Sequence, residues 1–573
     1  MMRFLTIIFP LLFSVNLFSQ AIGVVMDGEF TEWQGATVVA DANGDTPGLD
    51  LLELQLANDA DHLFLKILAA QEFELTDGSK LVIAIDTDNN PLTGVQENGL
   101  GVELYLYPGE RDVVFYGSSF PAYPSLYEAG WRHLPTVSSN TFEIALQRSA
   151  KPDGSNELLP HPSISLALWV EGSNGDYLPN AGNTIEYTFD DTPLPEYEAI
   201  TFTRESADHL RLMTWNTLQN GLDDFSRQGS FKRVLSAVQP DIVTFNECWD
   251  LTAPMVASFM NSALPLGGAN SWKAIKLDQG NITVSRYPIL ENWEVRPGSR
   301  LTASLIDLPD NFATDILVVN GHLRCCDADG TRQLEADAFA AFLNDAKTTG
   351  GLIDLPEGTP IVLSGDLNLV GWRQQLETLL TGEVVNTNTY GPGGPPDWDG
   401  TALADALPLH THQPVAFTWQ SPFSSYPPSR LDYIIFANSV MQLAKGYVIR
   451  TDELPPDVLG NYGILALDSE NASDHNPAVA DFILPMATAT AESAAEVALA
   501  VRPNPFTEQV IIESSRSDGP LAAVVANMDG KVLWEGTVNG SLVIPAGRWP
   551  AGIYFLRVNE GRRVQTIRLV KLR

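Results

Sequence analysis

The chain is short of cysteine, of basic residues and of long apolar runs. It has 3 cysteines in 573 residues, which excludes a scaffold held together by disulfides. Lys and Arg number 34 against 71 Asp and Glu, for a net charge of −37. Proteins that bind long nucleic acids through phosphates normally carry a basic face. The charge balance therefore weighs against DNA or RNA as a ligand, although a local basic groove would still allow it.

The N-terminus carries the one apolar run that has a targeting pattern. Leu5–Phe18 follows Arg3, is interrupted by Pro10 and ends before the small and polar residues Ser19–Ala21. It is too short to cross a membrane, so residues 1–20 are interpreted as a signal peptide rather than a buried helix. No later run is long enough to cross a bilayer, and we expect an exported protein with no stable membrane span.

Residues 22–195 have the pattern of an all-β domain. Short runs rich in β-forming residues alternate with turn clusters, which predicts a two-sheet β-sandwich. The runs are Leu49–Leu56, His62–Ala69, Lys80–Ile85, Val102–Tyr107 and Ile164–Val170. The acidic turn Asp86–Pro91 could hold Ca²⁺, but it lacks the bidentate Glu of a helix-loop-helix site. The favoured alternative is that its Asp and Asn residues only form the turn.

Three motifs of this domain resemble a carbohydrate-binding domain of the family 9 type. They are Asp27-Gly28-Glu29-Phe30 with Trp33, Ala57–Leu63, and Asp86–Asn89 with Thr93-Gly94. The motifs are loose, and members of such a group need not bind sugar. The resemblance implies a sandwich that could bind a glycan.

Residues 208–485 alternate apolar strands with amphipathic helices. Phe231, Val234, Leu235 and Val238 recur at helical spacing, and Leu334, Ala338, Ala341 and Phe342 do much the same. Residues 486–497 are rich in Ala, Thr and Glu and are interpreted as a linker. Strand patterns return in residues 498–573.

The C-terminal segment resembles the sorting domain of type IX secretion. The motifs are Pro503–Phe506, Met528–Lys531, Ala551–Phe555 and the basic end Lys571–Arg573. The resemblance implies a Bacteroidetes-like bacterium, the type IX secretion machinery as a partner, and release or attachment at the cell surface. The alternative is an accessory β-sandwich with no sorting role.

Polar side chains lie at or next to strand ends in six segments of the central region. These segments carry Asn216, Glu247, His322, Asp366 with Asn368, Asp432, and Asp474 with His475. Two packed sheets can bring such ends together in one cleft. Carboxylates hold Mg²⁺, a base activates water, and histidines bind phosphate or protonate a leaving group. Six such ends predict metal-assisted phosphoryl chemistry, whereas one alone would be explained by a turn or a cap.

The same residues, with Ser285–Ile289, resemble the endonuclease/exonuclease/phosphatase superfamily over all of residues 208–485. The implied fold class is α+β: a central four-layer α/β/β/α sandwich of two mixed sheets, flanked by an N-terminal β-sandwich and a small C-terminal β-sandwich. The implied cofactor is Mg²⁺, with Mn²⁺ as the alternative.

The resemblance also implies a role for each site residue. Glu247 would be the principal metal ligand, assisted by Asn216 and Asp474. Asp366 would orient or deprotonate the attacking water, and Asn368 would hold phosphate or water. The phosphate-contacting histidine would be His475, oriented by Asp432, with His322 as a second histidine near the phosphate. Asn246 stands where many members have Gln, and its side chain is expected to point away from the metal.

Other residues near the motifs leave alternatives open. Arg324 could clamp phosphate or be a solvent-exposed arginine. His410 and His412 could add a metal, but Pro and Gly around them favour a loop. If Glu247 and His322 share a site, Cys248 would lie close enough to Cys325 or Cys326 for a disulfide.

Together these patterns predict a secreted, divalent-metal-dependent phosphoesterase that hydrolyses a phosphodiester or phosphomonoester. Two alternatives remain open. The first is an extracellular nuclease that acts on DNA or RNA, which would need a basic groove. The second is a surface binding protein on the same scaffold, which the complete set of acids, amides and histidines disfavours.

Overall fold

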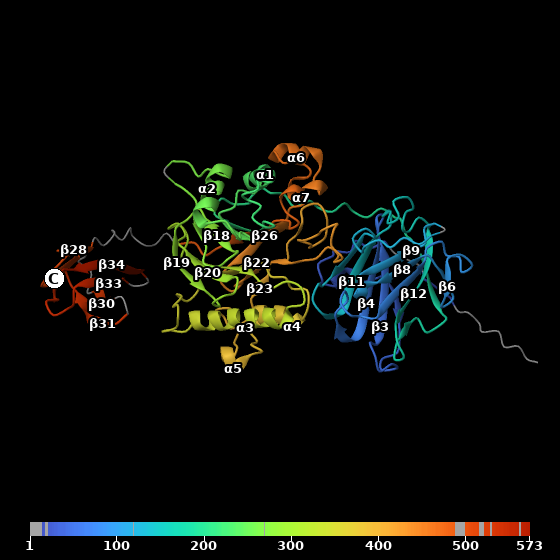
Figure 1. Cartoon of the computed structure of the whole chain (residues 1–573), viewed down its shortest axis with the longest axis horizontal. Coiled ribbons are helices and arrows are strands. Elements are labelled where there is room, and N and C mark those ends of the chain that lie inside the picture. The colour runs from blue at the N-terminus through green and yellow to red at the C-terminus, as the bar shows by residue number, and fades with distance from the viewer. Residues whose placement is uncertain are drawn as a thin grey trace, which may run out of the picture. The chain divides into compact units, whose positions relative to one another are not determined.

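The computed structural model describes residues 14–17, 21–118, 120–268, 270–487, 499–514, 521–527, 530–560 and 563–572 (Figure 1). The chain divides into two compact units, Met1–Met486 and Ala487–Arg573. Most of the predicted signal peptide lies outside the described residues, as does the predicted linker from residue 488 onward. Within the described ranges, no helix combines the length and the apolar composition that a membrane crossing requires.

The N-terminal part of the first unit is a sandwich of two sheets. In the first sheet the strand order is β1 (Ser14–Leu17), β14 (Thr184–Thr188), β12 (Ser163–Val170), β5 (Leu81–Asp86), β8 (Leu104–Tyr107) and β9 (Asp112–Phe115), with β13 (Tyr177–Leu178) beside β12. In the second sheet it is β10 (Trp131–Leu134), β11 (Ser139–Gln147), β4 (His62–Phe73), β3 (Leu51–Asn58) and β2 (Thr37–Ala40). A hairpin of β6 (Val95–Glu97) and β7 (Leu100–Val102) and two 3₁₀ turns, η1 (Thr31–Trp33) and η2 (Pro108–Glu110), complete it.

The alternation of apolar residues explains how the two sheets pack. Leu54 and Leu65 from one sheet and Ile83 and Leu166 from the other are all fully buried in one shared core. Each of the five predicted strands is present, with ends shifted along the chain.

The central part of the first unit contains two further sheets. One has the strand order β17 (Lys273–Ile275), β18 (Ile282–Ser285), β16 (Ile242–Asn246), β15 (Leu210–Asn216), β27 (Ala478–Ile483), β26 (Gln442–Val448) and β24 (Leu409–His410). The other has β19 (Ile289–Glu294), β20 (Leu301–Ile306), β21 (Ile316–His322), β22 (Ile361–Asp366), β25 (Asp432–Phe436) and β23 (Ala404–Asp405). Both sheets contain parallel and antiparallel pairs. The α+β class predicted from the sequence is confirmed.

Three apolar cores separate the layers of this part. Leu212 and Ile242 of one sheet meet Val318 and Val362 of the other in an inner core. Helices α1 (Gln228–Val238) and α2 (Ala253–Ala263) pack against the outer face of the first sheet, and α3 (Asp329–Ala346) and α4 (Arg373–Thr381) against that of the second (Figure 1). The shorter elements are α5 (Thr387–Tyr390), α6 (Pro456–Tyr462), α7 (Asp468–Ala472) and η3 (Thr451–Glu453).

The apolar spacing in the sequence predicts the buried face of α1 correctly but predicts that of α3 only in part. Phe231, Val234, Leu235 and Val238 of α1 are fully buried, as expected. In α3 the helix is present, but Leu334 and Ala341 are only partly buried. Its deepest apolar positions include Ala336, Phe339 and Leu343. This helix is rich in alanine and also buries polar residues, so the contrast between its faces is weak in the sequence.

The sandwich packs directly on the central part next to the carboxyl ends of its strands. The buried Thr136 hydroxyl donates to the Leu369 carbonyl at 2.9 Å, and the Ser138 amide donates to the Gly371 carbonyl at 2.8 Å. Elsewhere the Met26 backbone bonds Pro414 and Ala416. Two regions predicted as separate domains therefore form one compact unit.

The C-terminal unit has two small sheets. One contains β28 (Leu499–Arg502), β29 (Gln509–Ser514) and β32 (Ser541–Pro545), and the other β31 (Val532–Val538), β30 (Leu521–Asn527), β33 (Gly552–Glu560) and β34 (Arg563–Lys571). They share a core that includes Val510, Val525 and Leu556.

Candidate active site

The two central sheets bring the predicted polar strand ends to one edge. Strands β15 and β16 are parallel, so Asn216 lies opposite Asn246, and Glu247 follows at once. Strands β21 and β22 are also parallel, and His322 pairs with Asp366 in register. Strand β25 runs antiparallel to β22, so its first residue, Asp432, lies opposite Asp366. The convergence predicted from six segments is present.

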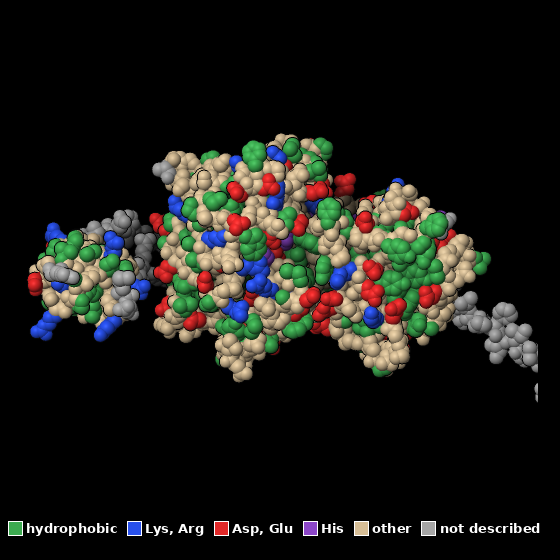
Figure 2. All heavy atoms as spheres, in the orientation of Figure 1, with side chains coloured by type: hydrophobic (Ala, Val, Ile, Leu, Met, Phe, Trp, Pro, Cys, Tyr) green, Lys and Arg blue, Asp and Glu red, His purple; other side chains and the backbone are tan. Residues whose placement is uncertain are grey.

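A cavity of about 460 Å³ opens at this edge. From the central part it is lined by Glu247, Trp249, Arg300, His322, Asp366, Asn368, Trp419, Asp474 and His475, among others. In Figure 2, histidine appears in a hollow of the surface with basic and acidic side chains beside it. Asn216 and Asp432 are fully buried behind this lining.

Asp366 is the most deeply placed acid of the cavity wall. It is 2% exposed, and its Oδ2 accepts a hydrogen bond from Nδ2 of Asn216 at 2.9 Å. Burial raises the pKa of Asp366 to about 7, and the carboxylate of Asp432 adds to the rise against the opposing charge of His475. An acid with this pKa can give up and take back a proton near neutral pH.

His475 is held by Asp432 and faces Asp366. Nδ1 of His475 lies 2.7 Å from Oδ2 of Asp432, and Nε2 lies 3.8 Å from Oδ2 of Asp366. Burial lowers the pKa of His475, but the carboxylates of Asp432 and Asp366 outweigh it and raise that pKa to about 10. The ring is therefore an imidazolium at neutral pH, and its Nε2–H lies on the side of Asp366 and the cavity.

His322 has the opposite charge state. Burial, together with the charges of Arg300 and His475, holds the pKa of His322 well below its usual value. Its Nε2 lies 3.4 Å from Oδ2 of Asp366, so this contact is between a neutral ring and an acid rather than a full ion pair. The guanidinium of Arg300 lies 3.1 Å from a ring nitrogen and stacks 5.2 Å from the ring of Trp249. Arg300 supplies the fixed positive charge on this side.

Glu247 projects from a strained position at the end of β16. Its φ is +58°, in the left-handed region, and its Oε2 accepts from the Gln219 amide at 2.8 Å. Nδ2 of Asn216 lies 3.3 Å from Oε1 of Glu247, while its Oδ1 accepts from the Leu218 amide. Asn216 thus links the carboxylates of Glu247 and Asp366 through its amide nitrogen.

The polar groups of this wall fit a divalent cation of the Mg²⁺ kind. Such an ion takes one or two carboxylates and keeps several waters, and Glu247 offers a partly exposed carboxylate at the cavity. Asp474 lines the same cavity, and its Oδ2 accepts from the Trp419 indole at 3.0 Å. Burial is the main cause of the raised pKa of Asp366, and the charges of Asp432 and Glu247 add to it; a bound cation would offset the charge contribution.

Residues 213–475 match the family model described as Endonuclease/Exonuclease/phosphatase family. This segment is an endonuclease/exonuclease/phosphatase domain. Members of that superfamily are usually hydrolases that act on phosphoesters. Residues 500–572 match the Secretion system C-terminal sorting domain, so the chain is directed to secretion or to attachment at the cell surface.

Several solved structures resemble the chain at low identity. An endonuclease/exonuclease/phosphatase from Beutenbergia cavernae is 18% identical over 63% of this chain and 100% of its own, with a TM-score of 0.30. Sphingomyelinase C from Streptomyces griseocarneus is 15% identical over 48% and 99%, with a TM-score of 0.30. An AP endonuclease from Leishmania major is 14% identical over 50% and 93%, with a TM-score of 0.28. Curated protein sequences give no match. At such values the activities of these proteins do not transfer to the chain.

Two asparagines of the endonuclease/exonuclease/phosphatase domain hold Asp366 and its surroundings in place. Asn246 points between the sheets, away from Glu247: its Nδ2 donates to Asn320 at 2.8 Å and its Oδ1 accepts from the Asp366 amide at 3.0 Å. Asn368 is 7% exposed and donates through Nδ2 to the Leu323 carbonyl at 3.2 Å, while its amide donates to Oδ1 of Asp366.

The N-terminal sandwich supplies one wall of the cavity. Besides the residues of the endonuclease/exonuclease/phosphatase domain, the cavity is lined by residues of the sandwich: Glu74, Thr76, Asp77, His133 and Thr136. Burial raises the pKa of Glu74, and the charges of Asp329, Asp77 and Asp327 raise it further. Acids from two parts of the chain therefore gather at the rim.

Trp249, Arg300 and Trp419 are among the residues that line the cavity and were missed in the sequence. Arg300 immediately precedes β20, whereas the sequence search followed the carboxyl ends of strands. Because β20 is antiparallel to β21, its amino end lies at the same edge as His322. A search of both ends of antiparallel neighbours would have found it.

The predicted disulfide is wrong. Cys248 is fully buried in the core beneath α1 and α2, whereas Cys325 and Cys326 are exposed at the cavity rim. All three are free, and Sγ of Cys325 lies 2.7 Å from Sγ of Cys326. The side chain of Cys248 points into the core although the next residue back, Glu247, faces the cavity.

Burial and contacts bear on the remaining alternatives. Arg324 is exposed, and the arginine that borders His322 is Arg300. His410 is 2% exposed, and its Nδ1 lies 3.0 Å from Oε2 of Glu453, a contact within the fold. Neither His410 nor His412 belongs to a group of ligands close enough for one ion, as far as the described residues go.

Proposed function

We propose that the chain is a secreted, divalent-metal-dependent phosphoesterase that hydrolyses a phosphodiester or phosphomonoester of a small molecule or head group. The observation that carries the proposal is the pairing, in one cavity, of an acid with a pKa near 7 and a histidinium held by a buried carboxylate. The two groups have opposite roles in proton transfer, and their environments separate their pKa values.

Asp366 would act as the general base. At neutral pH its carboxylate can orient a water and accept its proton as the water oxygen bonds to phosphorus. The bond from phosphorus to the ester oxygen breaks in the same step, and the leaving oxygen takes a proton from solvent. Asn216 and the backbone amide of Asn368 fix the orientation of this carboxylate from two sides.

Positive charge on the cavity wall would bind the phosphoryl oxygens. His475 donates from Nε2 while Asp432 holds Nδ1, and Arg300 adds a second cation. His322 stays neutral and can donate or accept one hydrogen bond without adding charge.

A divalent ion would be held by Glu247, with Asn216 and Asp474 beside it. When bound, such an ion neutralises charge on the phosphoryl group and lowers the cost of forming the attacking and leaving oxygens. Mg²⁺ is the expected ion, and Mn²⁺ accepts the same ligands.

The rim favours a small substrate over a long nucleic acid. Glu74, Asp77 and Asp327 line the cavity and would repel a polyanionic backbone that extends beyond the reacting phosphate, whereas Asp329 is paired with Arg332. A substrate with one or two phosphates avoids most of this repulsion.

The test is hydrolysis by the full-length chain with Mg²⁺, Mn²⁺ or EDTA, on duplex DNA, RNA, bis-p-nitrophenyl phosphate, p-nitrophenyl phosphate and phospholipids. Turnover that requires metal, and that is lost in Glu247→Gln and Asp366→Asn but kept in the exposed control Asp399→Asn, is expected on the small esters or phospholipids. Preferential turnover of DNA or RNA would favour the nuclease. No turnover, with no metal bound by calorimetry, would favour a binding protein.

A further inference from the structure

We propose that the N-terminal sandwich holds a structural Ca²⁺ between the loop that joins β2 to β3 and the loop that precedes β13, with Asp41, Asp45 and Asp176 as its protein ligands and the buried carboxylate of Asp50 beside them. The proposal does not depend on the proposed phosphoesterase function.

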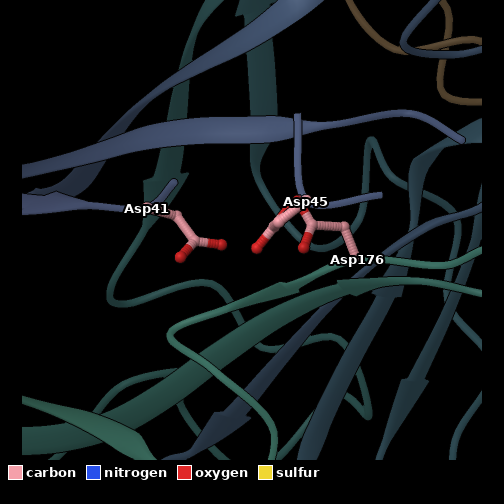
Figure 3. A group of neighbouring side chains, drawn as sticks. All are labelled: Asp41, Asp45 and Asp176. Atoms are coloured by element: carbon pink, nitrogen blue, oxygen red, sulfur yellow. The ribbon is translucent and has the colours of Figure 1, made fainter. Parts of the chain in front are cut away.

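Three carboxylates converge from two separate segments. Each of Asp41, Asp45 and Asp176 offers an oxygen, and these oxygens lie within 4.8 Å of one another. Figure 3 shows the carboxylate of Asp41 pointing toward those of Asp45 and Asp176. An ion about 2.3–2.6 Å from each oxygen, the ligand distance of Ca²⁺, can bridge such a group.

Asp50 gives an independent sign that a ligand belongs here. It is 4% exposed, and its Oδ2 accepts from the amide of Gly44 at 2.8 Å, so the carboxylate is turned to the 41–45 loop. Its Oδ1 is buried and has no hydrogen-bond partner. A buried carboxylate oxygen without a partner costs free energy, and a bound cation removes that cost.

The group also lacks a compensating positive charge. Asp176 is 6% exposed, and after burial the charges of Asp41 and Asp45 raise its pKa. Burial raises the pKa of Asp41 as well, followed by the charges of Asp45 and Asp50. Among the causes that act on these two acids, no described Lys, Arg or His contributes. Four acids at one place without a cation are what a divalent ion would neutralise.

The second acidic group of the sandwich, Asp86, Asp88 and Glu103, differs because it has no buried side-chain oxygen without a hydrogen-bond partner. The oxygens of Asp86 accept from the amides of Asn90 and Gly101, and those of Asp88 accept from the Thr93 hydroxyl. These bonds support the interpretation that residues 86–91 only form a turn. The group supplies a matched control.

The ion would fix two loops that border the active-site wall. The Thr46 hydroxyl already donates to the Asn174 carbonyl at 2.7 Å, and both loops line a cleft of about 690 Å³ that also contains Glu74 and Asp77. Alternating positions Asp41, Asn43 and Asp45 on a flexible loop suit the variable geometry of Ca²⁺. For an exported protein a dissociation constant of about 10⁻⁴–10⁻³ M would suffice.

The test uses full-length protein carrying Glu247→Gln, which removes the principal carboxylate of the active-site metal. Calorimetric titration with Ca²⁺ and thermal unfolding with and without about 10 mM Ca²⁺ are compared for this protein, for added Asp45→Asn and for added Asp88→Asn. Asp45 is exposed, so its substitution leaves the fold intact.

We expect Ca²⁺ to raise the Tm by about 2–4 °C in the parent and in Asp88→Asn, and to have no effect in Asp45→Asn. Without Ca²⁺, Asp45→Asn should be at least as stable as the parent, because one like charge is removed. Absence of Ca²⁺ binding by the parent would overturn the proposal. So would a response that is lost in Asp88→Asn but kept in Asp45→Asn.

Discussion

Nδ1 of His475 lies 2.7 Å from Oδ2 of Asp432, and both side chains are almost completely buried. The other oxygen of Asp432 has no hydrogen-bond partner, so His475 is the side chain that this carboxylate holds. The pair fixes the tautomer of the ring and keeps its proton, which leaves Nε2 as the donor that faces Asp366.

Replacing Asp432 with Asn should reduce kcat by about 10²-fold or more, because the histidine loses both its orientation and its charge. KM should change less. The same substitution should lower the pKa of His475, which NMR titration of the ring can follow. Asp399→Asn, on an exposed loop, is the control. An unchanged kcat in a folded Asp432→Asn protein would exclude the orienting role.

The pH dependence of activity should be bell-shaped. Asp366 must be ionised to accept a proton, so activity should fall as the pH drops through the pKa of Asp366, which is about 7 without metal and lower once a cation is bound beside it. His475 must be protonated to donate, so activity should fall again above about 10. The measurement is kcat/KM from pH 5 to about 11, beyond the upper limb. An acid limb that keeps its midpoint in Asp366→Glu and in other carboxylate variants of the wall would assign that limb to another group.

Part of the site could be predicted from the sequence because some strands carry a polar residue directly after an apolar run. Asn216, Glu247 and Asp366 were found this way, and parallel pairing places Asn216 opposite Asn246 and His322 opposite Asp366. Arg300 and Trp249 could not be found by the same rule. One precedes its strand, and the other lies on a loop whose path depends on the pairing of distant strands.

The contribution of the sandwich to the cavity could not be predicted from the sequence either. Glu74 and Asp77 are ordinary surface acids by pattern, and only the buried contacts of Thr136 and Ser138 bring them to the active site. The disulfide predicted for Cys248 was wrong for a related reason. Adjacent residues at the end of a strand point in different directions, so the place of Glu247 did not determine that of its neighbour.

Asn246→Ala should destabilise the fold by about 1–3 kcal/mol, since it leaves buried partners without hydrogen bonds. Those partners include the Asn320 side chain and the Asp366 amide. Urea unfolding of the full chain gives the difference, and kcat should fall as well because Asp366 shifts. The exposed Asn438→Ala, in the turn that follows β25, should stay within about 0.5 kcal/mol of the wild type. Equal stability of the two variants would contradict the role given to Asn246.

Neutralising the rim should relax the discrimination against polyanions. In the double variant Glu74→Gln/Asp77→Asn we expect KM for an oligonucleotide to fall by about 2- to 5-fold at low salt, with little change for p-nitrophenyl phosphate. The difference should shrink in high salt. Asp61→Asn, on the same sandwich and exposed, should leave both KM values unchanged. If KM fell equally for both substrates, the acidic rim would not discriminate between substrates by their charge.

Cys248 should be unreactive in the native protein and reactive after unfolding. It is fully buried, and burial raises the pKa of its thiol to about 12, so little thiolate forms at neutral pH. Labelling of reduced, native protein with a thiol reagent should therefore modify Cys325 and Cys326 but spare Cys248, as peptide mapping would resolve. The same protein in denaturant should label at Cys248 as well. A Cys248→Ala variant should show no change in native labelling. Rapid native labelling of Cys248, or recovery of a peptide that joins it to Cys325 or Cys326, would contradict the buried, unpaired thiol.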